Sequence, residues 1–223
     1  MPIRKGVLAP GEIYHVYNKA VGSDRLFEND FYVNEALKRI QFYKFETSLK
    51  YIYFNKYKKN LLSKELFSIK YKENRPLIEV YAHSIMPTHY HFVIKELIEN
   101  GLKVFISKFQ MSYARLYNAK NTRGGVVFRG RFRTKRVTNT DHFKHIVRYV
   151  HLNPVTAHLF EFNDLPNSLR SSYLEYVKND TKYDIVNKEF VLKQFNTLQS
   201  FTLFHRDQVD YQRKLAKIKK LLF

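Results

Sequence analysis

The chain contains no cysteine and no tryptophan among its 223 residues. The lack of cysteine excludes a disulfide framework and any metal site built on thiolates. No apolar run approaches the roughly 20 residues of a membrane span, and the first five residues, Met-Pro-Ile-Arg-Lys, lack the apolar region of a signal peptide. We therefore expect a soluble protein of the cytoplasm that has no membrane partner.

Acidic residues are also scarce, with 20 Asp and Glu against 39 Lys and Arg, a formal net charge of +19. Such an imbalance predicts an extended positive potential and a polyanionic partner, most simply nucleic acid. Aromatic residues make up 16% of the chain, as 17 Tyr and 19 Phe. Their rings can stack on unpaired bases, although most of them are expected to fill the core or line its rim.

The apolar pattern predicts a single core. Strands are expected at residues 13–18, at 77–85, from His89, and at 126–137. Helices are expected from Asp30, over 102–116, and from about Asp141. The last helix should extend no further than Asn153, because Pro154 disfavours a helical conformation at the residue before it. The order β-α-β-β-α-β, then α, is that of an α+β, ferredoxin-like split βαβ antiparallel sheet with helices on one face. The other face would stay open, as in domains that lay a nucleic acid strand across such a sheet.

Two stretches fall outside this core. Residues 49–76 are a lysine-rich insertion, either a small helical excursion or a basic loop, within a core domain that we expect over 1–155. Residues 156–223 form a basic, helical C-terminal extension. Its last segment, Arg213–Phe223, is amphipathic and could bind DNA or a partner, although a solvated lysine face is the commoner explanation for such a pattern.

The most informative motif is the pair His89 and His91 within Met86–Ile94 (MPTHYHFVI). On a strand, residues i and i+2 point to the same face, about 6.6–6.8 Å apart. Two imidazoles so placed can bind one divalent metal, while Tyr90 and Phe92 face a core. The alternative is two polar histidines on a solvated strand face.

The third predicted helix carries a second group of polar side chains. Tyr149 and Asn153 are i and i+4 and therefore neighbours on the shoulder of its apolar face, with His142 and His145 on the same stripe. A metal on two imidazoles and a side-chain oxygen would orient a phosphate, which a tyrosine could attack to form a covalent phosphotyrosine. Surrounding positive charge should favour the Tyr149 phenolate.

Alternatives remain at this stage. Tyr113 and Tyr117 on the second helix are rival nucleophiles, and Tyr149 could be a rim tyrosine with its hydroxyl in water. The densest basic run is predicted to contact DNA phosphates, with three of its arginines on one strand face; a solvated edge strand protected by charge is the alternative. The run comprises Arg123, Arg129, Arg131, Arg133, Lys135 and Arg136.

Three segments together resemble, in order and spacing, the HUH single-tyrosine transposases, and most closely the REP-associated tyrosine transposases. They are Met86–Ile94, Phe128–Phe132 (FRGRF) and Arg148–Val155 (RYVHLNPV), and the resemblance runs from about Ile13 to Tyr173. The combination is specific, although each segment alone is not.

The resemblance implies that His89 and His91 are metal ligands, that Asn153 takes the place of the third ligand, and that Tyr149 is the nucleophile. It further implies cleavage of single-stranded DNA next to a hairpin, with Mg²⁺ or Mn²⁺, leaving a 5′-phosphotyrosine and a free 3′-hydroxyl. A homodimer associated with the nucleoid is expected.

The chain departs from the family pattern in two respects. The insertion at 49–76 is not part of the family core, which leaves hairpin recognition open, and the middle residue of the histidine motif is Tyr90 rather than an aliphatic residue. Two other hypotheses stand beside transposition: a catalytically inactive nucleic-acid-binding module of the same fold, and a replication-initiator nickase, which usually brings further domains.

Overall fold

A computed structural model describes residues 7–57, 74–178 and 182–209. Its centre is a four-stranded antiparallel sheet in the order β2-β3-β1-β4. The strands are β1 (Ile13–Lys19), β2 (Ile78–Met86), β3 (His89–Glu96) and β4 (Arg133–Arg136). The sequence-based fold class, an α+β antiparallel sheet with the predicted order of elements, is confirmed.

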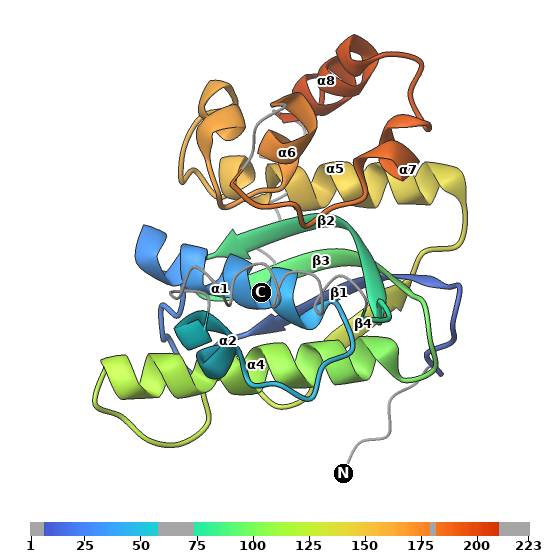
Figure 1. Ribbon diagram of the computed structural model, residues 1–223. Coiled ribbons are helices and arrows are strands. Elements are labelled where there is room, and N and C mark those ends of the chain that lie inside the picture. The colour runs from blue at the N-terminus through green and yellow to red at the C-terminus, as the bar shows by residue number, and fades with distance from the viewer. Residues whose placement is uncertain (1–6, 58–73, 179–181, 210–223) are drawn as a thin grey trace.

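Helices lie on both sides of the sheet (Figure 1). α1 (Asp30–Tyr43) and α4 (Gly101–Lys120) pack on each other and cover one face, and the short α2 (Tyr51–Tyr57) lies beside them. α5 (Thr140–Thr156) crosses the opposite face over β2 and β3. The face that the sequence left open is therefore crossed by the helix that carries Tyr149.

Strand alternation explains why the core lies between the sheet and α4. Tyr90 and Phe92 of β3 point to this side, and their ring centroids lie 5.5 and 6.0 Å from that of Phe109 on α4. The helix approaches closely at its first residue, because a Cβ on Gly101 would overlap the carbonyl oxygen of Leu77. These contacts turn the odd residues of β3, including His89 and His91, toward α5.

The C-terminal extension closes the free edge of β2. It contains the 3₁₀ turn η1 (Phe162–Asn167), α6 (Tyr173–Val177), α7 (Lys188–Leu192) and α8 (Leu198–Arg206). The Ile85 amide donates to the carbonyl of Arg170 at 2.8 Å, and the Asn187 amide donates to that of Val80 at 2.8 Å. Covering an edge strand in this way removes a site for unwanted strand pairing.

Two sequence-based boundaries are wrong. The long strand expected over 126–137 is only β4, because Gly130 takes a left-handed conformation (φ +54°) and Phe128 makes a single isolated bridge to Ala20. α5 also continues past Asn153 through Pro154 to Thr156. Burial of this last turn, including Pro154 and Val155, outweighs the local preference against helix before proline.

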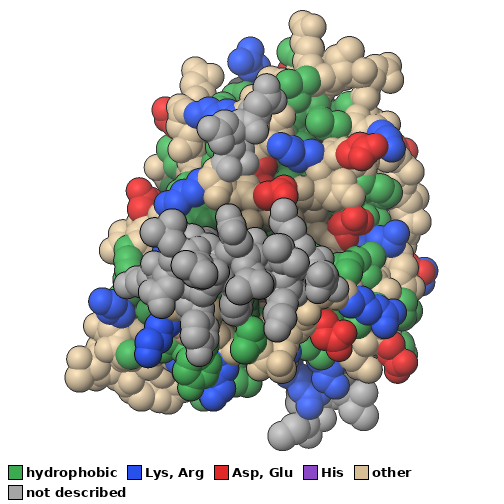
Figure 2. Space-filling view, viewed as in Figure 1, with side chains coloured by type: hydrophobic (Ala, Val, Ile, Leu, Met, Phe, Trp, Pro, Cys, Tyr) green, Lys and Arg blue, Asp and Glu red, His purple; other side chains and the backbone are tan. Residues whose placement is uncertain are grey.

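Part of the predicted appendages cannot be compared with the structure. Of the insertion at 49–76, the described part contains α2, while 58–73 lie outside the described residues, as does Arg213–Phe223. On the side seen in Figure 2, blue Lys and Arg side chains are interspersed with red Asp and Glu over the described surface.

Among the described residues, no helix combines the length and apolarity needed to cross a membrane.

Candidate active site under helix α5

The tight β2–β3 connection positions the two histidines of the motif. Hydrogen bonds from other segments fix Pro87 and Thr88. The amide of Phe27 donates to the Pro87 carbonyl at 2.9 Å, and the amide of Ala20 donates to the Thr88 carbonyl at 2.8 Å. β3 then begins at His89. The His89 and His91 rings lie on the α5 side with centroids 5.0 Å apart.

Helix α5 brings Tyr149 onto these rings. The helix begins after Asn139, whose side chain accepts a hydrogen bond from the His142 amide at 2.8 Å. The half-buried Tyr149 ring stands edge-on to two imidazoles, with centroids 5.8 Å from that of His91 and 5.8 Å from that of His15. Tyr149 and the histidine motif therefore lie together within one chain.

Asn153 lies one helical turn after Tyr149 and is buried. Its side-chain nitrogen donates to the Ser84 hydroxyl at 3.2 Å, and Ser84 is the residue of β2 opposite His91. The amide oxygen of Asn153 is then the atom that remains for a cation. The predicted set His89, His91, Tyr149 and Asn153 therefore lies on one face of the sheet.

His145 and the rival tyrosines lie away from this site. His145 pairs with Arg148 at 2.7 Å and contacts Phe204 of α8, so it faces the extension. Tyr113 is fully buried on the opposite side of the sheet, and its hydroxyl donates to the Leu26 carbonyl at 2.6 Å. Tyr117 follows on the same helix α4. Neither rival can reach the histidine motif without a change of fold.

Three residues of β1 belong to the site and were missed from the sequence. His15, Tyr17 and Lys19 lie opposite Val93, His91 and His89 of β3. The Nε2 atom of His15 is 2.9 Å from Nδ1 of His91, and Tyr17 stacks on His15 with ring centroids 5.1 Å apart. The alternation of His15, Tyr17 and Lys19 along the first predicted strand is the signal that could have revealed this face.

The site histidines are held neutral. Burial is the main cause and lowers the pKa of His89 to about 4, with a further contribution from Lys19. Burial and the charge of Lys135 lower the pKa of His15 to about 4, and burial places the pKa of His91 well below its ordinary value. Neutral imidazoles keep the lone pairs that metals require.

Burial has the opposite effect on the nucleophile candidate. It raises the pKa of Tyr149 above its ordinary value, with a smaller contribution from Tyr17. The sequence-based expectation that positive charge favours the Tyr149 phenolate is therefore not met in the unliganded site, because burial raises this pKa. Deprotonation needs help from a ligand or substrate.

The donor set fits a divalent cation only with the asparagine included. In the described part of the chain, no three His, Asp or Glu side chains are grouped as metal ligands. His89 and His91 supply two nitrogens on one strand face, and the Asn153 amide oxygen would be the third donor. Three such ligands cannot surround Mg²⁺ completely. They suit a divalent cation that keeps water and phosphate oxygens in its remaining coordination positions.

The predicted basic run divides between the two faces of β4. Arg133 and Lys135 are exposed and lie opposite Tyr17 and His15, so they share the site face. Arg136 alternates to the other face and forms an ion pair with Glu12. Of the rest, Arg123 is paired with Asp24, whereas Arg129 and Arg131 are exposed next to the buried Phe128 and Phe132.

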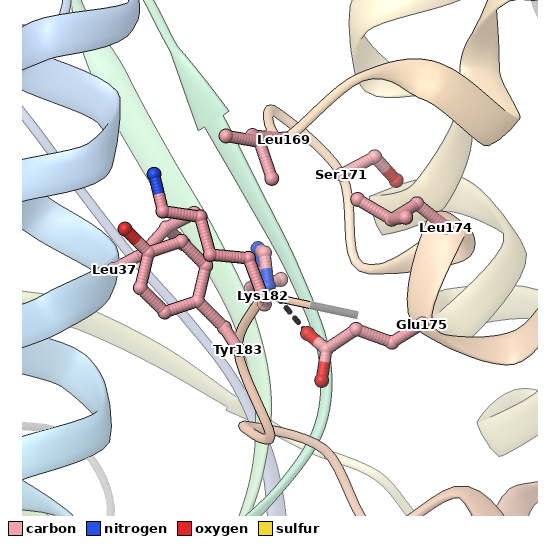
Figure 3. A pocket seen from close by; sticks show the side chains of 8 residues that line it. Leu37, Leu169, Ser171, Leu174, Glu175, Lys182 and Tyr183 are labelled. Carbon is pink, nitrogen blue, oxygen red and sulfur yellow. Dashed lines mark hydrogen bonds and ion pairs between the residues drawn. The ribbon is translucent and has the colours of Figure 1, made fainter. Parts of the chain in front are cut away.

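A second histidine cluster lies between α5 and the extension. Nδ1 of His151 is 2.9 Å from Nε2 of His205, and Nε2 of His151 is 3.0 Å from the Ser172 hydroxyl. Nearby, His83 pairs with Glu175 at 3.2 Å in a small pocket also lined by Leu37, Lys182 and Tyr183 (Figure 3). His83 and Ser84 are consecutive on β2, so this pocket lies on the other face of the sheet from the candidate site.

The buried histidines predict a steep loss of stability in mild acid. Burial keeps the pKa of His205 at about 3 and that of His151 well below its ordinary value. Between pH 6.5 and these values the unfolded chain binds more protons, so the free energy of unfolding falls as the pH falls, by about 2 kcal/mol per histidine from pH 6.5 to 5.

Urea denaturation at pH 7.5, 6 and 5 measures this effect. His205→Gln should flatten the dependence, whereas His158→Asn, at an exposed position, should leave it unchanged. Equal unfolding free energies of the original protein at pH 7.5 and 5 would contradict the assignment.

Comparison with known proteins finds a likeness among solved structures. No protein-family model and no curated sequence matches the chain. A solved structure of a REP-associated tyrosine transposase bound to a REP hairpin is similar, with a TM-score of 0.52 and 14% sequence identity. The similarity covers 84% of this chain and 94% of that one. The two proteins share the fold.

Proposed function

We propose that this protein is a single-tyrosine HUH DNA transposase, a metal-dependent enzyme that nicks and rejoins single-stranded DNA next to hairpins. The main support is the convergence of Tyr149 with His91 under α5, with ring centroids 5.8 Å apart in one chain. The transposase of similar fold is bound to a hairpin, which supports the same class of substrate here.

The proposed step is a transfer of the DNA phosphate to tyrosine. The Tyr149 oxygen bonds to phosphorus as the bond from phosphorus to the 3′ oxygen breaks. The phenol proton passes to water, and the departing 3′ oxygen takes a proton from water. The products are a 5′-phosphotyrosine and a free 3′-hydroxyl, and attack by an incoming 3′-hydroxyl reverses the step to rejoin DNA.

The residues around Tyr149 have separate tasks in this proposal. Mg²⁺ or Mn²⁺ on His89, His91 and Asn153 would supply Lewis-acid activation and orient the phosphate. Lys19, Arg133 and Lys135 carry positive charge along the same face and would hold the neighbouring phosphates. Because the set converges within one chain, nicking does not require the homodimer, which stays a prediction.

The direct test is a search for a covalent adduct. The protein is incubated with Mg²⁺ and labelled single strands that carry hairpins from its own genomic flanks, then analysed under denaturing conditions. We expect a protein–DNA adduct with Mg²⁺ and none with EDTA. Salt-dependent binding with no adduct under either Mg²⁺ or Mn²⁺ would contradict the enzyme and support the binding-module alternative.

The division of the basic run predicts unequal effects of charge removal. Arg133→Gln combined with Lys135→Gln should weaken single-strand binding and reduce the slope of log affinity against log salt by roughly 0.7 for each DNA phosphate that is no longer neutralised. Arg136→Gln is the matched control, because this side chain lies on the other face and is paired with Glu12. Fluorescence anisotropy at several salt concentrations measures the slopes, and equal weakening of binding in both proteins would refute the assigned face.

A further inference from the structure

Each proposed metal ligand is held by one side-chain hydrogen bond from a different part of the sheet. The three pairs are Thr88 Oγ1 with His89 Nδ1 at 2.9 Å, His15 Nε2 with His91 Nδ1 at 2.9 Å, and Ser84 Oγ with Asn153 Nδ2 at 3.2 Å. Thr88 belongs to the β2–β3 connection, His15 to β1 and Ser84 to β2. The supports therefore surround β3 on both sides.

All three bonds use the atom that a cation would not use. An imidazole that binds metal through Nε2 carries its proton on Nδ1, and that proton needs an acceptor. The Thr88 oxygen and the His15 nitrogen are placed to accept it from His89 and His91. In the same way, the Ser84 oxygen accepts from the Asn153 amide nitrogen and leaves the amide oxygen free.

Two of the three supporting residues, Ser84 and His15, are buried. Ser84 is fully buried and His15 is only 7% exposed, and His15 is further packed against the ring of Tyr17. A buried donor or acceptor that loses its partner costs about 1–3 kcal/mol, which keeps each pair in one arrangement. The orientation of the ligands is thus built into the metal-free protein.

We propose that His15, Thr88 and Ser84 form an outer shell that fixes the tautomers of His89 and His91 and the amide orientation of Asn153 for divalent cation binding. The inference rests on the proposed function, because it requires the three ligands to share a cation. His15, Thr88 and Ser84 are positioning residues: they do not contact the cation, and they set which ligand atoms face it.

The first test needs no substitution. Long-range ¹H–¹⁵N NMR of the metal-free protein reports which ring nitrogen of each histidine carries the proton. We expect the proton on Nδ1 in both His89 and His91. A proton on Nε2 of either ring would overturn the assigned role of its partner, whatever the activity of the enzyme.

The second test measures Mn²⁺ affinity by the electron paramagnetic resonance signal of the free ion. Thr88→Val keeps the side-chain shape but removes the acceptor, whereas Thr88→Ser keeps the hydroxyl. His15→Phe and His15→Gln form the corresponding pair. We expect Thr88→Val and His15→Phe to weaken binding on the order of 10–100-fold, and Thr88→Ser and His15→Gln to stay within about threefold of the original.

The outcomes separate the inference from the function on which it rests. Failure of the original protein to bind Mn²⁺ would contradict the metal-dependent function itself. Binding by the original protein that His89→Ala abolishes, but that Thr88→Val and His15→Phe leave unchanged, would overturn the outer shell alone. Thermal unfolding of each variant verifies that the fold persists. If a variant fails to fold, the NMR measurement on the original protein still tests the inference.

Discussion

Tyr149→Phe is expected to abolish the covalent adduct while single-strand binding persists. The substitution removes the attacking oxygen and nothing else: the ring can keep its edge-on contacts with His15 and His91, and the Tyr149 hydroxyl makes no hydrogen bond to any described residue. Loss of a covalent nucleophile lowers turnover by a factor on the order of 10⁴ or more. Adduct yield and nicked product are measured on the same labelled hairpin strand.

Tyr17→Phe is the matched control for this experiment. Tyr17 is a second tyrosine beside the histidine motif, and its ring centroid lies 5.7 Å from that of His91. We expect Tyr17→Phe to retain adduct formation, because its ring stacks flat on the imidazoles instead of meeting them edge-on from α5. The reverse result, with loss in Tyr17→Phe and retention in Tyr149→Phe, would move the nucleophile to β1.

The second large effect is expected from His89→Ala. Loss of one of two imidazole ligands should reduce Mg²⁺-dependent nicking to the level seen with EDTA, because the Asn153 oxygen and a single histidine cannot hold the cation in place. His89 is the better choice than His91, since it is half-buried at the start of β3, whereas His91 is packed among the rings of His15, Tyr17 and Tyr149. The fold should therefore survive the change.

Hairpin binding and Mn²⁺ affinity are measured together with nicking in this variant. We expect hairpin affinity within a few-fold of the original and no measurable Mn²⁺ site. His158→Asn is the control for removal of a histidine, because this exposed residue has a left-handed backbone (φ +55°) that asparagine tolerates. Undiminished nicking by His89→Ala would remove the histidine motif from the chemistry.

The histidine motif and helix α5 could be found from the sequence because both rest on local periodicity. Alternation alone put His89 and His91 on one face and Tyr90 and Phe92 on the other, and the i, i+4 spacing paired Tyr149 with Asn153. From the sequence, the meeting of these two faces was one possibility among several, supported by the family resemblance, and the fold brings them together. The sheet order β2-β3-β1-β4 places β3 under α5, a long-range arrangement that periodicity does not contain.

The misses have physical reasons of two kinds. The strand over 126–137 and the helix end at Asn153 were both predicted from local preference, and the structure differs at each place. The chain turns at Gly130, and burial carries α5 past Pro154. His15 was missed because it stands in the first strand without a motif, 76 residues from its partner His91. Its role depends on strand pairing, which a single sequence does not reveal.

The site also explains why the basic residues need to be sorted by structure. From the sequence, Arg133, Lys135 and Arg136 form one run of positive charge. β4 turns the first two toward His15 and Tyr17 and the third toward Glu12. Net charge therefore predicts a polyanionic partner, whereas strand register predicts which charges would contact it.

Identification of the residue that carries DNA tests the account most directly. The adduct formed with Mg²⁺ is digested with protease and nuclease, and mass spectrometry locates the nucleotide phosphate on the peptide. We expect the modification on Tyr149, with none on Tyr17, Tyr113 or Tyr117. A phosphate on any other side chain would contradict the site proposed under α5.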